Sequence, residues 1–496
     1  MIKLIINFIT IIVLLCAIST IVSGTAATGS YTATFNPTQN WGVWEGFGTS
    51  LAWWAQTYGN NTVLADIMFT TQNVTYFDGT TVLPGLGLNI VRYNAGASTW
   101  VESFGRKMVQ SPEIKRSRQV EGYWLNWASE DPQSDSWNWA ADPLQRNMMA
   151  MARDRGVQYF ELFSNSPIWW MTYNLNPSGA DLPAMNNLET WNYQNHTVYM
   201  ATIAQYAAEN WNISFTSIDP FNEPSGDFWI AFGSQEGCHF DVEAQKDVIP
   251  YMRKEIDSRR LTAMLAASDE NNYRRALDTW NSFDSSIKQA VDKVNVHGYE
   301  LTKGPRSELY EAVNSQGKVL WNSEYGEGDI TGLSLATNLL LDLAQLHPTA
   351  WVYWQVLDIS GWGMIEADEN ANPPSIGAVA TKYYVLAQFS RHIRHGMTII
   401  QSSDGNSVAA FDSVNNKLVI VSANIASSAQ TITFNLSKFT TVNGGYGGIV
   451  PRWATETNGN GDLYSYHEDT YIQDKMFSVT FNSQTVQTFE IEGVYL

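Results

Sequence analysis

The sequence predicts an α/β protein: a (β/α)8 TIM barrel with an attached antiparallel β-sandwich built from both ends of the chain. Two observations carry this prediction. Short apolar runs alternate with amphipathic helical stretches about eight times between residues 45 and 392, which is the pattern of a parallel barrel. After residue 392, polar and apolar residues alternate singly instead, as they do in antiparallel strands.

The chain begins with the layout of a secretory signal peptide. Lys3 precedes a long apolar run, and small residues follow that run at positions 23–27, as in signals that are cleaved. We expect residues 1–24 to be removed, with the cut near Gly24 or Ala27, and an uncleaved membrane anchor is the alternative. The mature protein is then expected to be extracellular, with no membrane attachment.

The segment 30–44 comes before the barrel but has the texture of the C-terminal part. Tyr31–Asn36 reads "YTATFN", in which apolar and polar residues alternate, as in a half-buried strand. We expect this segment to cross over and add a strand to the sandwich.

The predicted barrel covers residues 45–392. Its strands are nearly continuous apolar runs, as expected for parallel strands buried on both faces. These runs are Glu45–Trp53, Leu88–Tyr93, Tyr159–Asn165, Ser217–Asn222, Leu261–Ser268, Lys293–His297, Lys318–Ser323 and Ala350–Gln355. Helices are predicted at Leu144–Arg155, His196–Trp211, Val242–Arg260, Arg274–Phe283, Ser307–Gln316, Ser334–Gln345 and Ile376–His392. A doubly wound open sheet is the alternative, but no Gly-x-Gly-x-x-Gly follows the first strand.

Residues 393–496 are predicted to form the β-sandwich. Segments such as "VAAFDSVNNKLVIVSAN" and "MFSVTFNSQTVQTFEIEGVYL" alternate polar and apolar residues, with Asn, Gly and Ser between them. Short strands separated by such turn residues are typical of sandwiches.

The composition narrows the classes of partner. The chain has 496 residues, 44% hydrophobic and 16% charged, which is a folded composition long enough for two domains. Its formal net charge is -20, so neither nucleic acid nor an anionic membrane surface is an expected partner, since phosphate binding needs a basic surface. Neutral polymers remain. Asn-x-Ser/Thr sequons, which predict a glycoprotein if the chain is secreted, lie at Asn60, Asn73, Asn195, Asn212 and Asn435.

Chemistry in a barrel sits at the C-terminal ends of the strands. Carboxylates, amides and aromatic residues gather at the predicted ends: Trp54, Arg92, Asn94, Trp169, Asn222, Glu223, Asp269, Glu270, His297, Tyr299, Glu324 and Trp354. No Cys/His cluster has metal-ligand spacing, and no phosphate-binding loop is present. We therefore expect no metal and no cofactor. The residue types suit sugar chemistry.

Glu223 and Glu324 form the best carboxyl pair. Hydrolysis of a glycosidic bond needs one carboxyl to protonate the leaving oxygen and a second to attack the anomeric carbon or activate water. The two glutamates follow the fourth and seventh strands, on opposite sides of the ring. Glu327 is the alternative nucleophile. Asp269 is interpreted instead as the cap of a helix that begins in "DENNYRR".

Six segments together resemble the retaining glycoside hydrolases of family 30. They are "GFGTSLAWWA", "VRYNAGAS", "SNSPIWWM", "DPFNEPSG", "VHGY" and "LWNSEYGEGD", in order along nearly the whole mature chain. The resemblance implies a barrel joined to a side sandwich, with Glu223 as acid/base and Glu324 as nucleophile. It implies that Arg92, Asn222, His297 and Tyr299 support them and that Trp169 and Trp354 line the sugar site. Asn94 and Trp54 are expected to bind substrate or support the site.

Physical chemistry supports three of these roles. Arg92 is expected to lower the pKa of Glu324 and keep it ionised. Asn222 is expected to hydrogen-bond a sugar 2-hydroxyl, and Tyr299 to orient Glu324. The aromatic segment Tyr123–Trp139 follows the second strand, and we expect about half of its aromatic side chains to contact substrate or wall the cleft.

The substrate is expected to be a β-linked polysaccharide. The first of the six segments and "EGYWLNWASEDP" are most similar to the fungal-type endo-β-1,6-galactanases of the family, which implies cleavage of β-1,6-galactan side chains of arabinogalactan. A β-1,6-glucanase or a xylanase is the alternative. The loop "VLDISGWGMIEADENANPP" has no cation to bind glucuronic acid, although another loop could supply one. A non-catalytic carbohydrate-binding protein is disfavoured by the presence of both glutamates. A monomer is expected.

Overall fold

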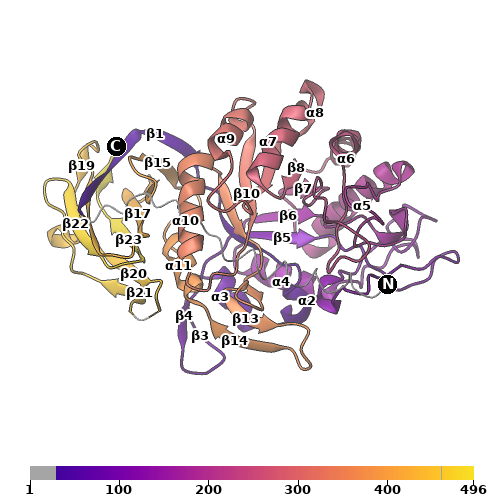
Figure 1. Ribbon diagram of the computed structural model, residues 1–496, viewed down its shortest axis with the longest axis horizontal. Helices are drawn as coiled ribbons and strands as arrows, with labels where there is room; N and C mark the ends of the chain where they lie inside the picture. The colour runs from indigo at the N-terminus through magenta and orange to yellow at the C-terminus, as the bar shows by residue number, and fades with distance from the viewer. Residues whose placement is uncertain (1–28, 460) are drawn as a thin grey trace, which may run out of the picture.

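The computed structural model describes residues 29–459 and 461–496. It consists of a barrel with surrounding helices and a second, mostly antiparallel sheet at one side (Figure 1). The predicted fold class is confirmed. The predicted signal peptide lies outside the described residues.

Within the described residues, eight parallel strands close into the barrel, in the order β10-β11-β2-β5-β6-β7-β8-β9. Each of them falls on one of the eight predicted apolar runs. Their bounds are β2 Gly46–Ser50, β5 Ile90–Asn94, β6 Tyr159–Phe163, β7 Ser217–Asp219, β8 Met264–Glu270, β9 Lys293–His297, β10 Val319–Tyr325 and β11 Ala350–Tyr353. The register sets Arg92 opposite Glu161 and Glu324 opposite His297, so charged side chains of neighbouring strands meet inside the ring.

Helices cover the outside of the barrel and pack their apolar faces against the strands. The main ones are α4 Pro143–Asp154, α5 Tyr193–Tyr206, α6 Val242–Ser258, α7 Tyr273–Ser282, α9 Arg306–Asn314, α10 Leu333–Leu341 and α11 Thr381–Ser390. Asp241 and Asn272 cap α6 and α7 by accepting hydrogen bonds from backbone N–H groups in the first turn. The short helices α2 Ala55–Tyr58, α3 Thr62–Phe69 and α8 Ser285–Ala290 complete the layer.

Several predicted boundaries differ from the structure by two or more residues. The last helix was expected from Ile376, but Ser375–Val379 is strand β14, which pairs with β13 (Ile365–Asp368), and α11 begins at Thr381. Gly377 and the β-branched Ile376 and Val379 favour an extended backbone over a helix. Strand β8 extends to Glu270, two residues beyond the predicted end.

The described part of the chain also holds a nine-stranded sheet, in the order β21-β20-β23-β17-β16-β15-β1-β18-β22. The bounds are β1 Tyr31–Val43, β15 Thr398–Ser402, β16 Ser407–Asp412, β17 Lys417–Asn424, β18 Gln430–Asn435, β20 Arg452–Glu456, β21 Leu463–His467, β22 Met476–Phe481 and β23 Thr485–Ile491. The sheet folds over a core in which the ring of Phe434 lies 5.0 Å from that of Phe489.

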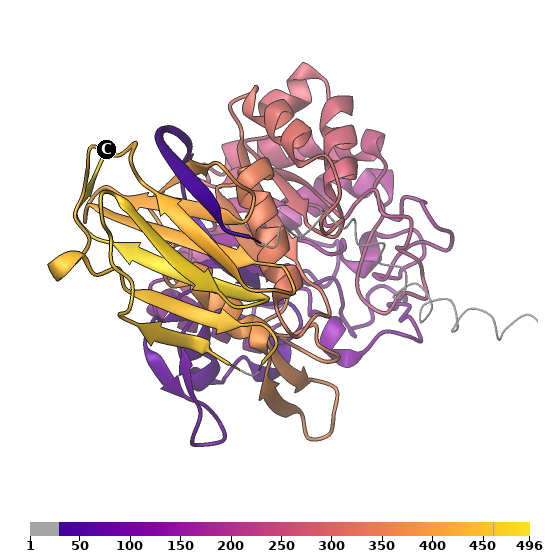
Figure 2. The ribbon, with the colours of Figure 1, turned by 60° about the vertical axis from the view of Figure 1, so that its left-hand side comes forward.

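Strand β1 joins the two ends of the chain, as the sequence predicted. Tyr31–Thr34 pairs in parallel with β18, and Phe35–Val43 pairs antiparallel with β15. Figure 2 shows this strand alongside the C-terminal strands, away from the rest of the N-terminal half. The side sheet is therefore completed by residues that precede the barrel.

Helix α11 connects the barrel to the side sheet and packs against β20, β21 and β23. The buried amide of Gln388 donates to Thr455 Oγ1 at 2.8 Å, and its Oε1 lies 2.6 Å from the hydroxyl of Thr488. His392 contacts Glu490 and Tyr464 on the same sheet. Several side chains thus fix the side sheet to the last helix of the barrel.

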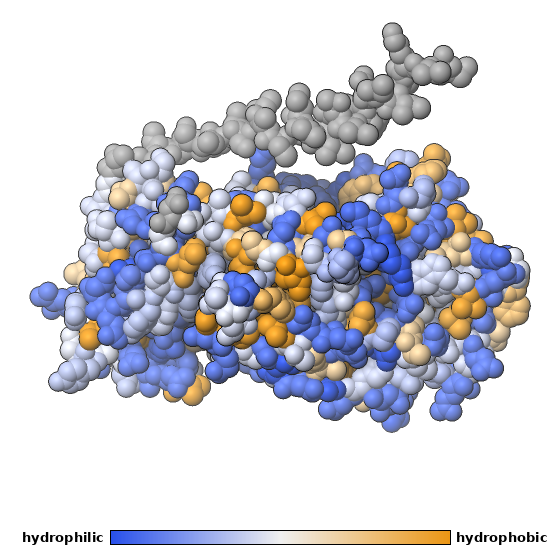
Figure 3. Space-filling model, turned by 90° about the horizontal axis from the view of Figure 1, so that it is seen from below, coloured by the Kyte–Doolittle hydropathy of each residue, from blue (hydrophilic) through white to orange (hydrophobic). Residues whose placement is uncertain are grey.

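The face of the molecule drawn in Figure 3 is predominantly hydrophilic, and its hydrophobic residues form small patches between larger hydrophilic areas. No helix in the described ranges has the length and apolar character needed to cross a membrane.

We predict that Gln388→Ala destabilises the contact between barrel and side sheet. The substitution leaves the buried hydroxyls of Thr455 and Thr488 without these partners, which costs about 1–3 kcal/mol of unfolding free energy. Calorimetry should show a lower unfolding temperature, whereas the exposed control Gln316→Ala should leave it unchanged. An unchanged unfolding temperature for Gln388→Ala would contradict this assignment.

Candidate active site

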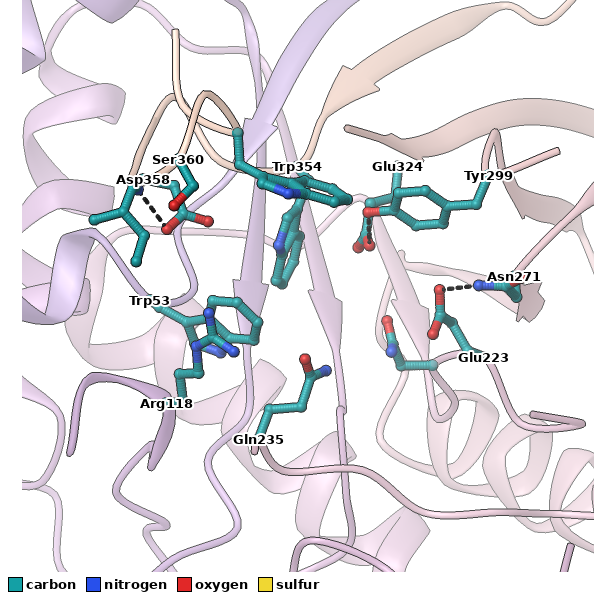
Figure 4. A pocket seen from close by; sticks show the side chains of 13 residues that line it. Trp53, Arg118, Glu223, Gln235, Asn271, Tyr299, Glu324, Trp354, Asp358 and Ser360 are labelled. Atoms are coloured by element: carbon teal, nitrogen blue, oxygen red, sulfur yellow. Dashed lines mark hydrogen bonds between the residues drawn. The ribbon is translucent and has the colours of Figure 1, made fainter. Parts of the chain in front are cut away.

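A pocket of about 520 Å³ opens at the C-terminal ends of the barrel strands. Figure 4 shows carboxyls, amides and indoles pointing into it from several different strands and loops. The lining residues are Trp53, Arg118, Asn222, Glu223, Gln235, Asn271, Tyr299, Glu324, Trp354, Asp358, Ile359, Ser360 and Trp362. Both predicted catalytic glutamates are among them.

Glu324 lies near the end of β10 and is almost fully buried. Its Oε2 accepts a hydrogen bond from Arg92 Nη1 at 2.9 Å, and its Oε1 accepts one from the Tyr299 hydroxyl at 2.9 Å. One donor from β5 and one from the turn after β9 therefore fix the direction of the carboxyl. Tyr299 makes the orienting contact that was expected.

Glu223 lies four residues beyond β7, on a turn with a left-handed backbone (φ 47°). Its N–H donates to the carbonyl of Asp269 at 2.8 Å, and its carbonyl accepts from Trp229 Nε1. The side-chain Oε1 accepts from Asn271 Nδ2 at 2.7 Å. A left-handed conformation is unfavourable for glutamate, and such residues are held only where surrounding contacts enforce it.

The two carboxyls face each other across the pocket. One oxygen of Glu223, one of Glu324 and a ring nitrogen of His297 all lie within 4.8 Å of one another. His297 Nδ1 lies 3.0 Å from Glu223 Oε1 and 3.4 Å from Glu324 Oε1. This spacing matches the close pair of a retaining glycosidase, roughly 5–5.5 Å, and leaves too little room for the water of an inverting one.

The same three side chains are the group of described residues with spacing suitable for a metal ion. Their chemistry does not favour one. Glu223 and Glu324 already accept hydrogen bonds from Asn271, Arg92 and Tyr299. Although burial opposes it, the charges of Glu324 and Asp269 raise the pKa of His297 well above its usual value, and a protonated imidazole is no metal ligand. The arrangement suits proton transfer.

A buried charge network lies directly beneath the pair. Arg92 Nε donates to Glu161 Oε1 at 2.9 Å, and its other nitrogens pair with Asp269 and Glu324. Glu161 also pairs with Lys293. Arg92 and Glu161 are fully buried, so breaking one contact would leave an unpaired charge in a dry interior.

The pKa values in this network divide the carboxyls into two kinds. Burial alone would raise the pKa of Glu161, but Lys293 and Arg92 outweigh it and lower the value. Asp269 behaves in the same way, with Arg92 and His297 as the cations that lower its pKa. Asp219 has the opposite shift, because burial and the charges of Asp269 and Glu161 raise its pKa well above the usual value.

Arg92 does not keep the pKa of Glu324 low, contrary to the sequence-based expectation. Burial raises that pKa to about 7, Glu223 and Asp269 add to the rise, and His297 and Arg92 only oppose it. Arg92 shares its charge among three carboxyls, so its effect on any one of them is diluted. Glu324 is therefore expected to change its charge near neutral pH.

The interpretation of Asp269 as a helix cap was wrong. Asp269 lies in β8, is fully buried and pairs with Arg92, while Asn272 caps the following helix by accepting from Arg275 N. The strand runs two residues farther than its apolar pattern because the polar side chains point into the charged interior. Sequence reasoning missed Glu161, Lys293 and Asn295 for the same reason, since each lies inside an apolar run.

Glu327, the alternative nucleophile, does not line the pocket. Its carboxyl lies 3.4 Å from Lys382 Nζ on α11, and the same ammonium donates to the Glu327 carbonyl and contacts the Tyr353 hydroxyl. The Tyr353 hydroxyl in turn donates to the carbonyl of Trp362, a pocket residue. Glu327 thus fixes the loop after β10 against the cleft wall.

Only some of the predicted tryptophans reach the pocket. Trp354 lines it, with its ring 5.0 Å from Trp53. Trp54 and Trp169 are fully buried and donate to Ser50 O and Thr99 Oγ1, so neither faces substrate. The neighbouring Trp53 takes the expected place of Trp54. The sequence offers no signal for this choice, because an adjacent pair of tryptophans does not reveal which one faces inward.

The two predicted amides have different surroundings. Asn222 lines the pocket, and its buried Oδ1 has no protein partner among the described residues. Asn94 accepts from Asn165 N at 3.1 Å below the pocket, so it supports the strand ends and does not contact the cleft.

The aromatic segment Tyr123–Trp139 packs internally and does not wall the pocket. Trp137 stacks between Trp124 and Trp139 at 4.9 and 5.3 Å, and Trp139 stacks on Tyr206 of α5 at 3.6 Å. The expectation for this segment was wrong because its aromatic rings bury one another. Residues that sequence reasoning missed fill the cleft instead: Arg118, Gln235, Asn271, Asp358, Ser360 and Trp362. Arg118 gives the cleft a cation that the loop after β11 lacks.

Comparisons with known proteins agree with this architecture. The model of O-glycosyl hydrolase family 30 matches residues 31–298, which is more than half of the chain. The chain therefore belongs to glycoside hydrolase family 30, and the resemblance noted in the sequence is confirmed. It is 52% identical over 465 residues to the endo-β-1,6-galactanase of Hypocrea rufa, covering 94% of this chain and 95% of that protein.

Solved structures share the fold at low identity. A conserved exported protein from Bacteroides fragilis superposes with a TM-score of 0.73 at 18% identity, covering 93% of this chain and 100% of the other. A family 30 subfamily 8 xylanase from Clostridium acetobutylicum superposes with a TM-score of 0.66 at 19% identity, with the same coverage. At this identity the two structures support the fold alone.

We predict that kcat/KM falls as pH rises through about 7, the pKa to which burial raises Glu324. Catalysis needs one proton in the site for the leaving oxygen, and the site loses a proton when Glu324 ionises above this pKa, so activity should decrease about tenfold per pH unit on the alkaline side. A pH–rate profile of the wild-type protein measures this. A profile that stays flat well into the alkaline range would contradict it.

Proposed function

We propose that this protein is a retaining endo-β-1,6-galactanase that cleaves β-1,6-galactan side chains by double displacement, with Glu223 as acid/base and Glu324 as nucleophile. The observation that carries the mechanism is the carboxyl pair, whose oxygens lie within 4.8 Å in a pocket at the barrel mouth. This spacing suits direct attack on the anomeric carbon by one carboxylate.

In the first step, Glu324 attacks the anomeric carbon and forms a glycosyl ester. Glu223 gives its proton to the departing glycosidic oxygen, so the leaving chain departs as an alcohol. In the second step, Glu223 is ionised and takes a proton from water, whose oxygen attacks the same carbon and releases Glu324. Two inversions leave the configuration unchanged.

His297 and Tyr299 accompany the movement of charge between the two carboxyls. His297 Nδ1 lies within 3.4 Å of both, so its proton can favour whichever carboxyl is ionised in each step. The Tyr299 hydroxyl and Arg92 hold the ionised Glu324 before attack. Fixed donors of this kind stabilise the changing charge without reorganisation of solvent.

The choice of β-1,6-galactan rests on the relative from Hypocrea rufa. It is 52% identical across nearly the full length of both chains, and it is an endo-β-1,6-galactanase. A β-1,6-glucanase or a xylanase has weaker support, because the family 30 xylanase described above is only 19% identical. A non-catalytic binding protein would have no need for two opposed carboxyls with donors on each.

We further propose a secreted, monomeric glycoprotein. Of the five sequons, those at Asn60, Asn73 and Asn212 are exposed, so they are the best candidates for glycans. Secretion rests on the apolar run after Lys3. The polysaccharide substrate accords with the acidic charge of -20, since neutral galactan requires no basic surface.

A product assay tests the proposed activity. The purified protein is incubated separately with de-arabinosylated arabinogalactan side chains, β-1,6-glucan and glucuronoxylan. We expect short galactose oligomers from the first alone, and NMR of the newly formed reducing ends should show the β-anomer first. Cleavage of another polymer would replace the substrate, and initial release of the α-anomer would refute the retaining mechanism.

Substitutions separate the two glutamates by role. Glu324→Gln should abolish turnover of every substrate, because no nucleophile remains. Glu223→Gln should lower kcat on galactan by a factor of roughly 10²–10⁴. On an aryl glycoside the first step should be slowed much less, because a good leaving group needs no proton. Burst kinetics on both substrates measure this. Equal losses on the two substrates would contradict the assignment of Glu223 as acid.

A further inference from the structure

Arg118 lies in the pocket at the end away from the carboxyl pair. It is the last residue of the 3-10 turn Arg116–Arg118, in the long loop after β5. Figure 4 shows its guanidinium against Trp53, with Asp358 on the adjoining wall, while Glu223 and Asn271 lie at the opposite end. The pocket therefore extends well beyond the carboxyls, and a cation lies at its far end.

The position of Arg118 is fixed from three sides. Its Cζ atom lies 4.2 Å from the centre of the Trp53 ring. Ser117 N donates to Asn370 Oδ1 at 3.4 Å, and Val120 N donates to Glu236 Oε1 at 3.0 Å. Glu236 is fully buried and directly follows the pocket residue Gln235. The guanidinium is thus preorganised, which lowers the entropy cost of binding a ligand.

The donors of this guanidinium are largely unused. A guanidinium carries five N–H groups, yet among the described residues the side chain of Arg118 makes one long hydrogen bond, from Nη1 to Ser234 Oγ at 3.5 Å. Burial lowers the pKa of Arg118, while Asp358 and Glu369 oppose that shift without forming an ion pair with it. N–H groups that are partly buried and lack close acceptors are stabilised when a ligand supplies oxygen acceptors.

We propose that Arg118 binds two neighbouring oxygens of a sugar residue and so forms a second sugar-binding subsite, remote from the bond that is cleaved. This inference rests on the proposed glycosidase function. The planar fork of a guanidinium matches two adjacent acceptors, which are either two hydroxyls of a neutral galactose residue or the carboxylate of a uronic acid residue. Trp53 orients the guanidinium through the indole face that Arg118 covers.

Chain-length kinetics of Arg118→Met test the subsite. The substrates are β-1,6-linked galacto-oligosaccharides of increasing length. We expect kcat/KM to fall roughly 10- to 100-fold on oligomers long enough to reach Arg118, mainly through KM, and to stay unchanged on the shortest oligomer that the wild type cleaves. Arg118→Lys keeps the charge but not the fork, so its loss should be intermediate.

Arg116→Met is the matched control. Arg116 lies in the same turn and also stacks on an indole, at 4.4 Å from Trp100, but it does not line the pocket. Its kinetics should equal those of the wild type at every length. A second set of oligomers, capped with a uronic acid, separates the two sources of oxygen: a larger loss on capped oligomers identifies the carboxylate, and an equal loss identifies the hydroxyls.

Two outcomes would overturn the subsite. An equal loss at all lengths would mean that Arg118 acts through the fold or the carboxyl pair, and no loss at any length would mean that it does not bind substrate. Both outcomes can be distinguished from a failure of the proposed function, because in that case the wild-type protein itself would cleave no β-1,6-galactan.

Discussion

The buried guanidinium of Arg92 is the interaction on which the site depends. From the middle of β5 it pairs with Glu161 of β6, Asp269 of β8 and Glu324 of β10, and so connects strands on different sides of the barrel. A charge buried this deeply is stable only when its partners are in place. Because Arg92 must be paired, its contact with Glu324 also fixes the direction of that carboxyl. The same ion pair therefore serves both the stability of the barrel and the placement of the nucleophile.

The charges around Arg92 make the interior beneath the pocket rich in carboxyls. Five carboxyls face three basic side chains there. The carboxyls are Glu161, Asp219, Glu223, Asp269 and Glu324, and the basic side chains are Arg92, Lys293 and His297. Burial and two neighbouring carboxylates raise the pKa of Asp219 well above its usual value, and burial raises the pKa of Glu324 to about 7. The excess of carboxyls therefore favours retention of a proton in the site, where acid catalysis needs one.

The barrel and its loops contribute to different parts of the pocket. Strand β10 and the turn directly after β7 hold the two carboxyls, whereas more distant parts of the segments after β5, β7 and β11 supply Arg118, Gln235 and Asp358 to the pocket. Buried Glu236 joins the segments after β5 and β7, and buried Lys382 ties the loop after β10 to the helix layer. Loop residues can therefore change the choice of sugar without disturbing the charge network.

The sequence by itself determined the barrel strands, the crossover of the N-terminal strand and the candidate pair Glu223 and Glu324, because these depend on local hydrophobic pattern and on residue type at strand ends. Only the tertiary structure decided that Trp53 and not Trp54 faces the pocket, that Asp269 joins Arg92 and caps no helix, and that the rings of Tyr123–Trp139 bury one another. It also brought Arg118 to the cleft from a loop far from both glutamates in sequence. Such choices depend on long-range packing and on the cost of unpaired buried charge, and neither is visible in the local order of residues.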